Sequence, residues 1–373
     1  MKRLGFGMMR LPQTDPKVPE SVDIAQVCTM VDTFLERGFT YFDTAYFYHA
    51  NQSECFVRDA LVKRHPRNSF LLADKMPVSI LKTADAAKQA AVFDEQLEKC
   101  GVDYFDYYLV HSLNAGNYET AQRLDTFAFL TSKKAEGRIR HLGFSFHDKA
   151  ELLDRILTEH PDVEFVQLQL NYLDWEDERI QSRKCYETVV RHGKKVVVME
   201  PVRGGRLATV PPEVAAEMAA LHPDWSPASW AIRFAASHNE VMMVLSGMSN
   251  MEQLLDNTGY MTDAAPLNGE ELALLARAAE TISALPAVAC TGCRYCVDGC
   301  PRNIPIPDYF ALYNRDQLPM RSGAKASVEE YEKLAEGNGF ASGCVKCNQC
   351  ESACPQQLPV IQWLQRVAST YGK

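Results

Sequence analysis

Several features of secreted, membrane and nucleic-acid-binding proteins are missing from this chain of 373 residues. Its first residues, Met1 to Gly7, show neither the long apolar core nor the cleavage site of a signal peptide, and no apolar run approaches the roughly 20 residues that span a bilayer. The formal net charge of −9 argues against a surface for polyanions, because phosphate contacts need clustered Lys and Arg. We therefore expect a cytoplasmic globular protein whose partners are neither nucleic acid nor membrane.

Two nucleotide-binding motifs are also missing. No Gly-x-Gly-x-x-Gly follows the first predicted strand, which disfavours an open dinucleotide-binding sheet. The stretch Pro201-Val202-Arg203-Gly204-Gly205-Arg206-Leu207 lacks the Gly-Lys-Ser/Thr ending of a P-loop, so nucleotide hydrolysis is not indicated. Two interpretations of this stretch stay open: it holds a pyrophosphate or an acidic substrate, or it is a tight turn with solvated arginines.

What the chain contains is a regular alternation of short apolar runs and helical patterns. The predicted strands are residues 4–6, 40–43, 70–75, 105–110, 140–145, 165–169, 196–200 and 241–246. The predicted helices include 85–100, 120–136, 149–159, 183–192, 228–237 and 269–285. Eight strand–helix repeats predict an α/β fold, a closed (β/α)8 TIM barrel over residues 1–285. Its last helix is expected to begin with a capping box of Asn268 and Glu271, and Pro286 to open a second, mainly helical domain over 286–373.

Polar residues end most of the apolar strands. In a barrel of this type the carboxyl ends of the strands share one face, where chemistry occurs. Each such residue alone could be a satisfied strand-end group, but together they predict an active site at that face. They are Asp43, Lys75, His111, Ser145, Gln169, Glu200 and Ser246.

Three of these residues, together with Tyr48 five positions after Asp43, suit acid–base chemistry. A tyrosine hydroxyl with a pKa near 10 is a poor proton donor or acceptor at neutral pH, but an adjacent ammonium lowers that pKa. Tyr48 and Lys75 supply this pair, Asp43 would keep the lysine charged, and His111 can hydrogen-bond a substrate oxygen. Such a site suits carbonyl reduction, in which hydride reaches carbon while Tyr48 protonates oxygen.

The same residues resemble the aldo-keto reductase family over roughly residues 1 to 285. Phe42-Asp43-Thr44-Ala45-x-x-Tyr48, followed by Ser53-Glu54, is similar to its first signature, and Lys75 and His111 complete its catalytic tetrad in family order. The resemblance implies NAD(P)H as cofactor and a small carbonyl or alcohol as substrate. It also implies nucleotide contacts by Ser145, Gln169, Ser246, Gly247, Met248, Ser249, Gln253 and Asn257.

Three departures from the family pattern bear on the cofactor and the fold. Ser145-Phe146 stands where the family usually has Ser-Asn for the nicotinamide carboxamide. No Lys or Arg lies within 247–250, although a 2′-phosphate normally needs one, so NADH and NADPH both stay open. The chain also lacks the N-terminal hairpin that plugs the barrel floor in many relatives.

The cysteines are concentrated at the end of the chain. Eight of the 12 form two runs, Cys290-x-x-Cys293-x-x-Cys296-x-x-x-Cys300-Pro301 and Cys344-x-x-Cys347-x-x-Cys350-x-x-x-Cys354-Pro355. This spacing is typical of [4Fe-4S] clusters, whereas zinc sites prefer pairs of Cys-x-x-Cys and the cytoplasm disfavours disulfides. A helix is predicted over 327–336, between the runs. The other cysteines are expected to be buried free thiols: Cys28, Cys55, Cys100 and Cys185.

The runs also resemble two-cluster ferredoxins, in which the fourth ligand crosses over between runs. That resemblance implies one cluster held by Cys290, Cys293, Cys296 and Cys354, and another held by Cys344, Cys347, Cys350 and Cys300. Aldo-keto reductases with such a ferredoxin-type tail form a subgroup that this chain resembles over its whole length.

The two halves handle electrons differently, because NAD(P)H delivers a hydride and each cluster passes single electrons. A barrel loop could bind FMN as a converter without a recognisable motif. The first hypothesis is an NAD(P)H-dependent or ferredoxin-coupled oxidoreductase with Tyr48 as acid/base. Whether a redox protein is a further partner stays open. The alternatives are an electron-transfer protein whose barrel is a docking scaffold, and clusters that are purely structural.

Overall fold

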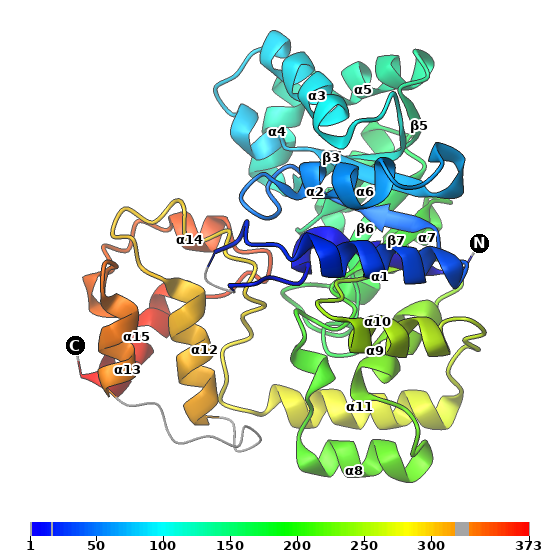
Figure 1. The fold of residues 1–373 in the computed structure, drawn as a ribbon. Coiled ribbons are helices and arrows are strands. Elements are labelled where there is room, and N and C mark those ends of the chain that lie inside the picture. Colours follow the sequence, from blue (N-terminus) through cyan, green and yellow to red (C-terminus); the bar gives the residue numbers. More distant parts are fainter. Residues whose placement is uncertain (1, 16–17, 318–327, 373) are drawn as a thin grey trace. The chain divides into compact units, whose positions relative to one another are not determined.

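The structure, a computed structural model, describes residues 2–15, 18–317 and 328–372 (Figure 1). The chain divides into two compact units. The barrel unit comprises Met1–Glu176, Gln181–Pro201 and Ser229–Asn268. The tail unit comprises Asp177–Ile180, Val202–Ala228 and Gly269–Lys373.

Eight parallel strands close into a barrel, as predicted, and each predicted strand overlaps an observed one. The strands follow chain order around the barrel, and β1 pairs with β8 to close it. They are β1 (Leu4–Gly7), β2 (Tyr41–Asp43), β3 (Leu71–Met76), β4 (Phe105–Leu113), β5 (Ile139–Phe146), β6 (Phe165–Gln169), β7 (Lys195–Met199) and β8 (Val241–Ser246).

Alternation along the strands explains why an apolar layer lies beneath a polar one. A buried apolar cluster draws on six strands and comprises Tyr41, Ala73, Tyr107, Leu109, Phe165, Val197, Met243 and Leu245. The Tyr41 and Tyr107 rings lie 5.0 Å apart, centroid to centroid. Side chains two positions further on share a face of the strand, which puts Asp43 and Lys75 directly after Tyr41 and Ala73. The aromatic layer fills the interior below the polar residues.

Helices alternate with the strands of the barrel. They are α1 (Ile24–Glu36), α2 (Ser53–Val57), α3 (Ala86–Cys100), α4 (Ala115–Arg123), α5 (Thr126–Ala135), α6 (Ala150–Glu159), α7 (Ser182–Arg191), α9 (Pro227–Ala236) and α10 (Met251–Tyr260). Shorter helical turns are η1 (Met8–Arg10), η2 (Arg58–Val62), η3 (Arg67–Ser69) and η4 (Val78–Leu81). Side-chain oxygens of Asp23, Asp85, Asn114 and Asn250 cap the first turns of α1, α3, α4 and α10.

One predicted helix, 120–136, was wrong as a single element. Asp125 adopts a left-handed backbone with φ of +51°, which separates α4 from α5. The next residue, Thr126, is fully buried and donates its hydroxyl to Gln89 Oε1 at 2.6 Å. This anchored hydroxyl fixes where α5 begins, and helical periodicity alone does not reveal it.

The tail unit contains α8 (Pro212–Leu221), α11 (Gly269–Ser283), α12 (Ile306–Gln317), α13 (Val328–Ala335), α14 (Gln349–Ser352) and α15 (Val360–Tyr371), with the turns η5 (Arg206–Ala208) and η6 (Ala341–Gly343). The helix predicted over 327–336 is present as α13, and its first predicted residue, Ser327, lies outside the described residues. Within this unit α8 and α11 lie side by side (Figure 1), joined by an ion pair between Arg277 and Glu217 at 3.2 Å.

The predicted domain boundary at residue 285 stays a prediction. The compact units divide the chain elsewhere, because α11 and the segment 202–228 group with the tail. Glu271, expected in a capping box, accepts a hydrogen bond from His222 on the segment after α8 at 2.7 Å. No helix in the described parts of the chain combines the length and apolarity needed to cross a membrane.

Candidate functional site

The four residues predicted for acid–base chemistry meet at the carboxyl ends of β2, β3 and β4. The Nζ atom of Lys75 lies 2.6 Å from Asp43 Oδ1 and 3.5 Å from the Tyr48 hydroxyl, and it donates to the Thr44 carbonyl oxygen at 2.6 Å. The rings of Tyr48 and His111 pack edge to face with centroids 6.4 Å apart. Strand register brings these groups together, since Asp43 pairs with Ala73, two residues before Lys75.

Lys75 and Asp43 form an ion pair that water does not reach. The Lys75 side chain is fully buried and the Asp43 side chain is 4% exposed. Burial raises the pKa of the Asp43 carboxyl, while the Lys75 ammonium and the Gln167 amide oppose that rise. Gln167 Nε2 donates to the second carboxylate oxygen at 3.2 Å, so both oxygens of Asp43 have partners. A buried pair of this kind holds its members in one geometry.

The expected lowering of the Tyr48 pKa is wrong for this structure. Burial raises the pKa of Tyr48 well above its ordinary value, and the negative charges of Asp43 and Glu200 raise it further. The Arg10 guanidinium lowers this pKa, but desolvation of the phenolate outweighs it. Tyr48 carries its proton at neutral pH and is ready to donate it.

His111 is a neutral imidazole in this site. Burial lowers the pKa of His111 well below its ordinary value, and Lys75 and His147 lower it further. Burial also lowers the pKa of His147 to about 4. The Nδ1 atom of His111 is buried, and no hydrogen-bond partner for it exists within residues 2–15, 18–317 and 328–372. Because an unpaired buried nitrogen costs free energy, this atom offers a place for a ligand oxygen.

The residues predicted to contact a nucleotide lie at the ends of β5, β6 and β8 and on α10, and hydrogen bonds hold several of their side chains. Ser145 Oγ accepts from the Ser112 amide at 2.7 Å, and Gln169 Nε2 donates to Asp174 at 2.7 Å. After β8, Asn257 Nδ2 donates to Ser246 Oγ at 2.8 Å. These bonds fix the side chains in place without a ligand.

The loop Gly247-Met248-Ser249 is bonded in the same way. The Ser249 amide donates to Gln253 Oε1 at 2.7 Å, and the Ser249 hydroxyl donates to the Arg10 carbonyl at 2.8 Å. Met248 is fully buried, whereas Ser249 is exposed. The loop is therefore held at Ser249, which is exposed to solvent.

Sequence reasoning missed Arg10 as a residue of this region. A Cβ atom added to Gly247 would lie 3.2 Å from Arg10 Cβ, so the Arg10 side chain runs along this loop. Its guanidinium lies 4.0 Å from Glu200. No Lys or Arg lies within 247–250 itself, but closure of the barrel pairs β8 with β1 and brings the residues after β1 beside this loop. The predicted barrel itself was the signal that could have found Arg10.

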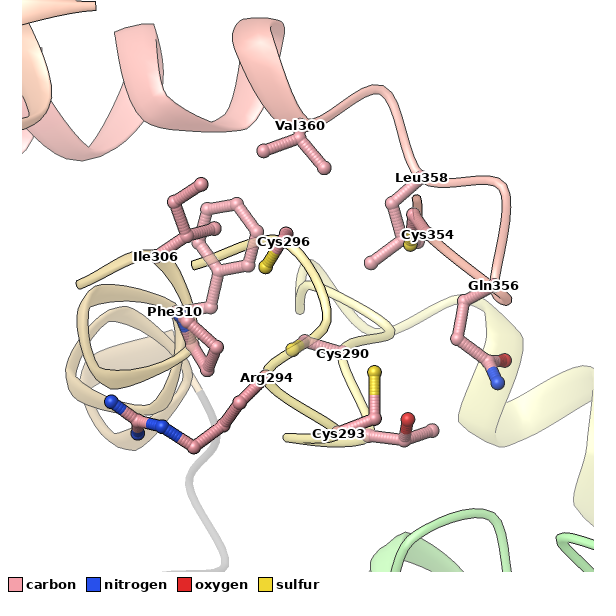
Figure 2. A pocket seen from close by; sticks show the side chains of 12 residues that line it. Cys290, Cys293, Arg294, Cys296, Ile306, Phe310, Cys354, Gln356, Leu358 and Val360 are labelled. Carbon is pink, nitrogen blue, oxygen red and sulfur yellow. The ribbon is translucent and has the colours of Figure 1, made fainter. Parts of the chain in front are cut away.

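Two cavities in the tail unit are each lined by four cysteines. Cys290, Cys293, Cys296 and Cys354 line the first cavity, and Figure 2 shows their sulfur atoms around one space. Cys300, Cys344, Cys347 and Cys350 line the second cavity. These are the two sets, with crossed fourth members, that the resemblance to ferredoxins implied.

The two cysteine runs also repeat in backbone conformation. Gly292 and Lys346, which precede the second cysteine of each run, have φ of +67° and +56°. Arg294 and Asn348, which follow it, both have φ of +66°. Such matching left-handed positions show that each run wraps around its cavity in the same way.

The repeat continues beyond the cysteines, which sequence reasoning also missed. Asn303 and Gln357 both have φ of +49°. The amide of Ile306 then bonds the Ile304 carbonyl at 2.8 Å, as Val360 bonds Leu358 at 2.8 Å, and a helix starts at each. The available signal was the sequence itself, where Ile304-Pro305-Ile306 and Leu358-Pro359-Val360 stand at the same distance from Cys-Pro.

The donor set and shape of the cavities fit iron–sulfur clusters. Their volumes are similar, about 330 and 310 Å³ including the part open to solvent, and apolar side chains complete both linings. In the described parts of the chain, no three His, Cys, Asp or Glu side chains converge as on a single metal ion. The thiols instead surround a space, as ligands at the corners of a cube do.

Burial keeps the Cys296 and Cys350 thiols protonated at neutral pH until a metal displaces the proton. Burial raises the pKa of Cys350 to about 11 and raises that of Cys296 further. All 12 cysteines are free thiols. Among the four outside the runs, Cys100 and Cys185 are buried as predicted, whereas Cys28 and Cys55 are half-buried.

Comparisons with known proteins agree with both parts of the chain. The Aldo/keto reductase family matches residues 3–280, and a 4Fe-4S dicluster domain matches residues 289–359. L-galactose dehydrogenase of Arabidopsis thaliana is 24% identical over 315 residues, which are 76% of this chain and 89% of that protein. NADH-specific methylglyoxal reductase of Escherichia coli is 24% identical over 200 residues, 49% of this chain and 58% of that protein.

Solved structures share the barrel fold. An aldo-keto reductase from Bacillus halodurans, in its holo form, has a TM-score of 0.57 at 24% identity and covers 74% of this chain and 91% of its own. An aldo/keto reductase from Klebsiella pneumoniae in complex with NADP and acetate has a TM-score of 0.57 at 19% identity, covering 74% and 90%. With the family match over most of the barrel and the dicluster match beyond it, the chain belongs to the aldo/keto reductase family and carries a C-terminal 4Fe-4S dicluster domain.

Proposed function

We propose that this protein is a nicotinamide-dependent oxidoreductase that reduces a small-molecule carbonyl to an alcohol, or runs the reverse reaction, with Tyr48 as acid and base. The observation that carries the proposal is the series Asp43, Lys75 and Tyr48, in which the ion pair is buried and Tyr48 is half-buried, with contacts of 2.6 and 3.5 Å at Lys75 Nζ. Membership of the aldo/keto reductase family supports it. The cytoplasmic location expected from the sequence stays a prediction.

Each of the four residues has a defined part in reduction. The nicotinamide, when bound, supplies a hydride to the carbonyl carbon. Tyr48, protonated because burial raises its pKa, donates its proton to the carbonyl oxygen, which becomes the alcohol hydroxyl. Lys75 stabilises the tyrosinate left behind, and Asp43 holds Lys75 in place. An imidazole nitrogen of neutral His111 orients the carbonyl oxygen.

The nucleotide would bind at the ends of β5, β6 and β8. Ser145 and Gln169 would contact the nicotinamide end, and Ser246 to Ser249, with Gln253 and Asn257, the remainder. One structural relative is described in complex with NADP and one sequence relative as NADH-specific, so both cofactors fit the proposal. Arg10 lies along Gly247 and supplies the cation that a nucleotide phosphate needs.

Substituting Arg10→Ala is expected to raise KM for the nicotinamide cofactor about 10- to 100-fold, the loss of one charge-assisted hydrogen bond worth about 1.5–3 kcal/mol. Steady-state kinetics with NADPH and NADH separately would measure it. An increase for NADPH alone assigns Arg10 to the 2′-phosphate, and equal increases assign it to the pyrophosphate. An unchanged KM for both, matching an Arg183→Ala control on the exposed face of α7, would remove Arg10 from the cofactor site.

We further propose that the clusters exchange electrons with the barrel chemistry. Oxidation of one NAD(P)H gives NAD(P)+, a proton that passes to solvent, and two electrons, which is one for each of two clusters. Because the nicotinamide releases these electrons as a pair and each cluster takes one, the coupling requires a group that separates them. The dicluster match supports the presence of the clusters, and no comparison supports the FMN that the sequence left open. FMN is therefore not assigned as the group that separates the electron pair.

Mixing anaerobically purified protein with NADPH or NADH in a stopped-flow spectrometer tests the coupling. The visible absorbance of the clusters should bleach on the time scale of cofactor oxidation. Clusters that stay oxidised while the same sample reduces a test aldehyde would contradict coupling and leave them structural. A sample that neither bleaches nor reduces any aldehyde would contradict the oxidoreductase proposal itself.

A further inference from the structure

The glycine-rich stretch after β7 is a tight turn, which is one of the two interpretations that the sequence left open, but its arginines are not both solvated. From Val202 onward it belongs to the tail unit, together with the cysteine runs. Arg203 is buried at 4% exposure, so it is not a solvated arginine. The role of the stretch therefore depends on the residues that it contacts in the tail unit.

Gly204 lies against the backbone of the first cysteine run. A Cβ atom added to Gly204 would lie 2.7 Å from both Thr291 Cβ and the Thr291 carbonyl oxygen, and 2.9 Å from Thr291 Cα. Gly204 also has φ of +63°, which only glycine adopts at little cost. Two of the three nearest atoms are backbone, so a larger side chain at 204 could not be accommodated by rotating the Thr291 side chain.

Backbone hydrogen bonds and a buried side chain hold the turn that contains Gly204, so the turn cannot easily move away from Thr291. The amides of Gly205 and Leu207 both donate to the Val202 carbonyl at 3.1 Å, and the Arg206 amide donates to the Arg203 carbonyl at 3.1 Å. Leu207 is fully buried and anchors the end of the turn. A side chain added at Gly204 would therefore push Thr291 rather than the turn.

Thr291 stands between two cysteines of the first cavity. It lines that cavity beside Cys290 and Cys293, and the next amide, that of Gly292, donates to Cys290 Sγ at 3.4 Å. Moving Thr291 outward would shift both sulfur atoms away from the positions that share one cavity with Cys296 and Cys354.

Within the described residues 2–15, 18–317 and 328–372, the matching position of the second cysteine run is not covered in this way. Val345 occupies the position in the second run that Thr291 occupies in the first, directly after the first cysteine. Thr291 is 5% exposed and Val345 is 57% exposed, although the two runs share their backbone conformation. The difference in burial thus comes from what covers the first run and not from the run itself.

We propose that Gly204 is a positioning residue for the first iron–sulfur cluster. The turn 202–207 supports the Cys290–Cys293 loop, and only a glycine at position 204 lets the turn and the loop pack together. The proposal rests on the presence of both clusters, which is part of the proposed function. It assigns the stretch to cluster retention instead of phosphate binding, and it predicts that only the first cluster depends on it.

The test compares Gly204→Ala with Gly205→Ala in the full-length protein purified anaerobically. Both positions have positive φ, so both variants bear a similar backbone cost, but a Cβ at 205 meets no atom within 4 Å. Gly204→Ala should retain about four of about eight irons per chain, while Gly205→Ala retains about eight. The EPR spectrum of dithionite-reduced Gly204→Ala should match that of Cys293→Ala, which removes a ligand of the first cluster.

Hydrogen exchange gives a second test that leaves Gly204 unchanged. Amides 202–207 should exchange about tenfold faster in Cys293→Ala than in wild type, and at the wild-type rate in Cys350→Ala, which affects the second cluster. The supporting role of the turn 202–207 would be contradicted by about eight irons per chain in Gly204→Ala, or by the same iron loss in Gly205→Ala as in Gly204→Ala. It would also be contradicted if amides 202–207 exchanged at the same rate in Cys293→Ala and Cys350→Ala. Wild-type protein purified without iron would instead contradict the presence of the two clusters, which is part of the proposed function.

Discussion

Replacing Tyr48 with Phe is expected to lower kcat for carbonyl reduction by a factor of about 10² to 10⁴, the usual contribution of a general acid. The substitution removes the one hydroxyl that lies 3.5 Å from Lys75 Nζ and leaves the ring in place. Cofactor oxidation at saturating aldehyde would measure kcat. Cluster absorbance should be unchanged, because Tyr48 lies in the barrel unit and the cysteine runs lie in the tail unit.

Tyr46→Phe is the matched control for this prediction. Tyr46 is two residues away and half-buried, and its hydroxyl contacts Glu95 at 3.3 Å instead of the tetrad. It should keep the wild-type kcat. Undiminished turnover by Tyr48→Phe would remove Tyr48 from the mechanism, and an equal loss in both variants would point to a structural effect.

The same mechanism gives kcat a flat pH profile. The pKa of Tyr48 is raised above its ordinary value near 10, and that of His111 is lowered below about 6.5. Tyr48 therefore keeps its proton up to about pH 10, and His111 stays neutral down to about pH 6.5, so kcat for reduction should not change between these limits. A fall in kcat well below pH 10 would mean that Lys75 lowers the Tyr48 pKa in the bound state.

The sequence predicted the barrel and the tetrad because both depend on local pattern. Short apolar runs that end in Asp43 or His111 identify the strands. Because parallel strands in a closed barrel all end at one face, the residues at those ends must lie close together. The break at Asp125 was not predictable in this way, because it depends on a hydroxyl buried against a neighbouring helix. The pKa of Tyr48 was predicted with the wrong sign, since the Tyr48–Lys75 pairing can be read from sequence but the desolvation of the phenolate cannot.

Residues that act across long sequence separations were the hardest to predict. Arg10 and Gly247 become neighbours only when β1 pairs with β8. Gly204 meets Thr291 only once the segment after β7 joins the tail unit. Glycine-rich stretches with flanking arginines are commonly phosphate sites, so composition pointed away from this packing role. In both pairs the sequence shows the chemical character of each residue, but it does not show which residue becomes its neighbour in the fold.

The crossed ligand sets make the last prediction, which separates the two cavities. Cys354 belongs to the second run in sequence but lines the first cavity with Cys290, Cys293 and Cys296. Cys354→Ala should therefore lose the first cluster and lower the iron content from about eight to about four per chain, and Cys300→Ala should lose the second. Iron analysis and EPR of the reduced, anaerobically purified variants would measure this.

Iron content alone does not tell which cluster has been lost, because either loss removes about four irons. The identity comes from comparing spectra: with crossed ligands, Cys354→Ala should match Cys293→Ala, and Cys300→Ala should match Cys347→Ala. If Cys354→Ala matched Cys347→Ala instead, each cluster would take its four ligands from one run. Cys185→Ala, a buried free thiol of the barrel unit, should keep about eight irons and both signals. Because each fourth cysteine closes the cavity of the other run, the crossed pattern also means that neither run can complete its cluster without the other.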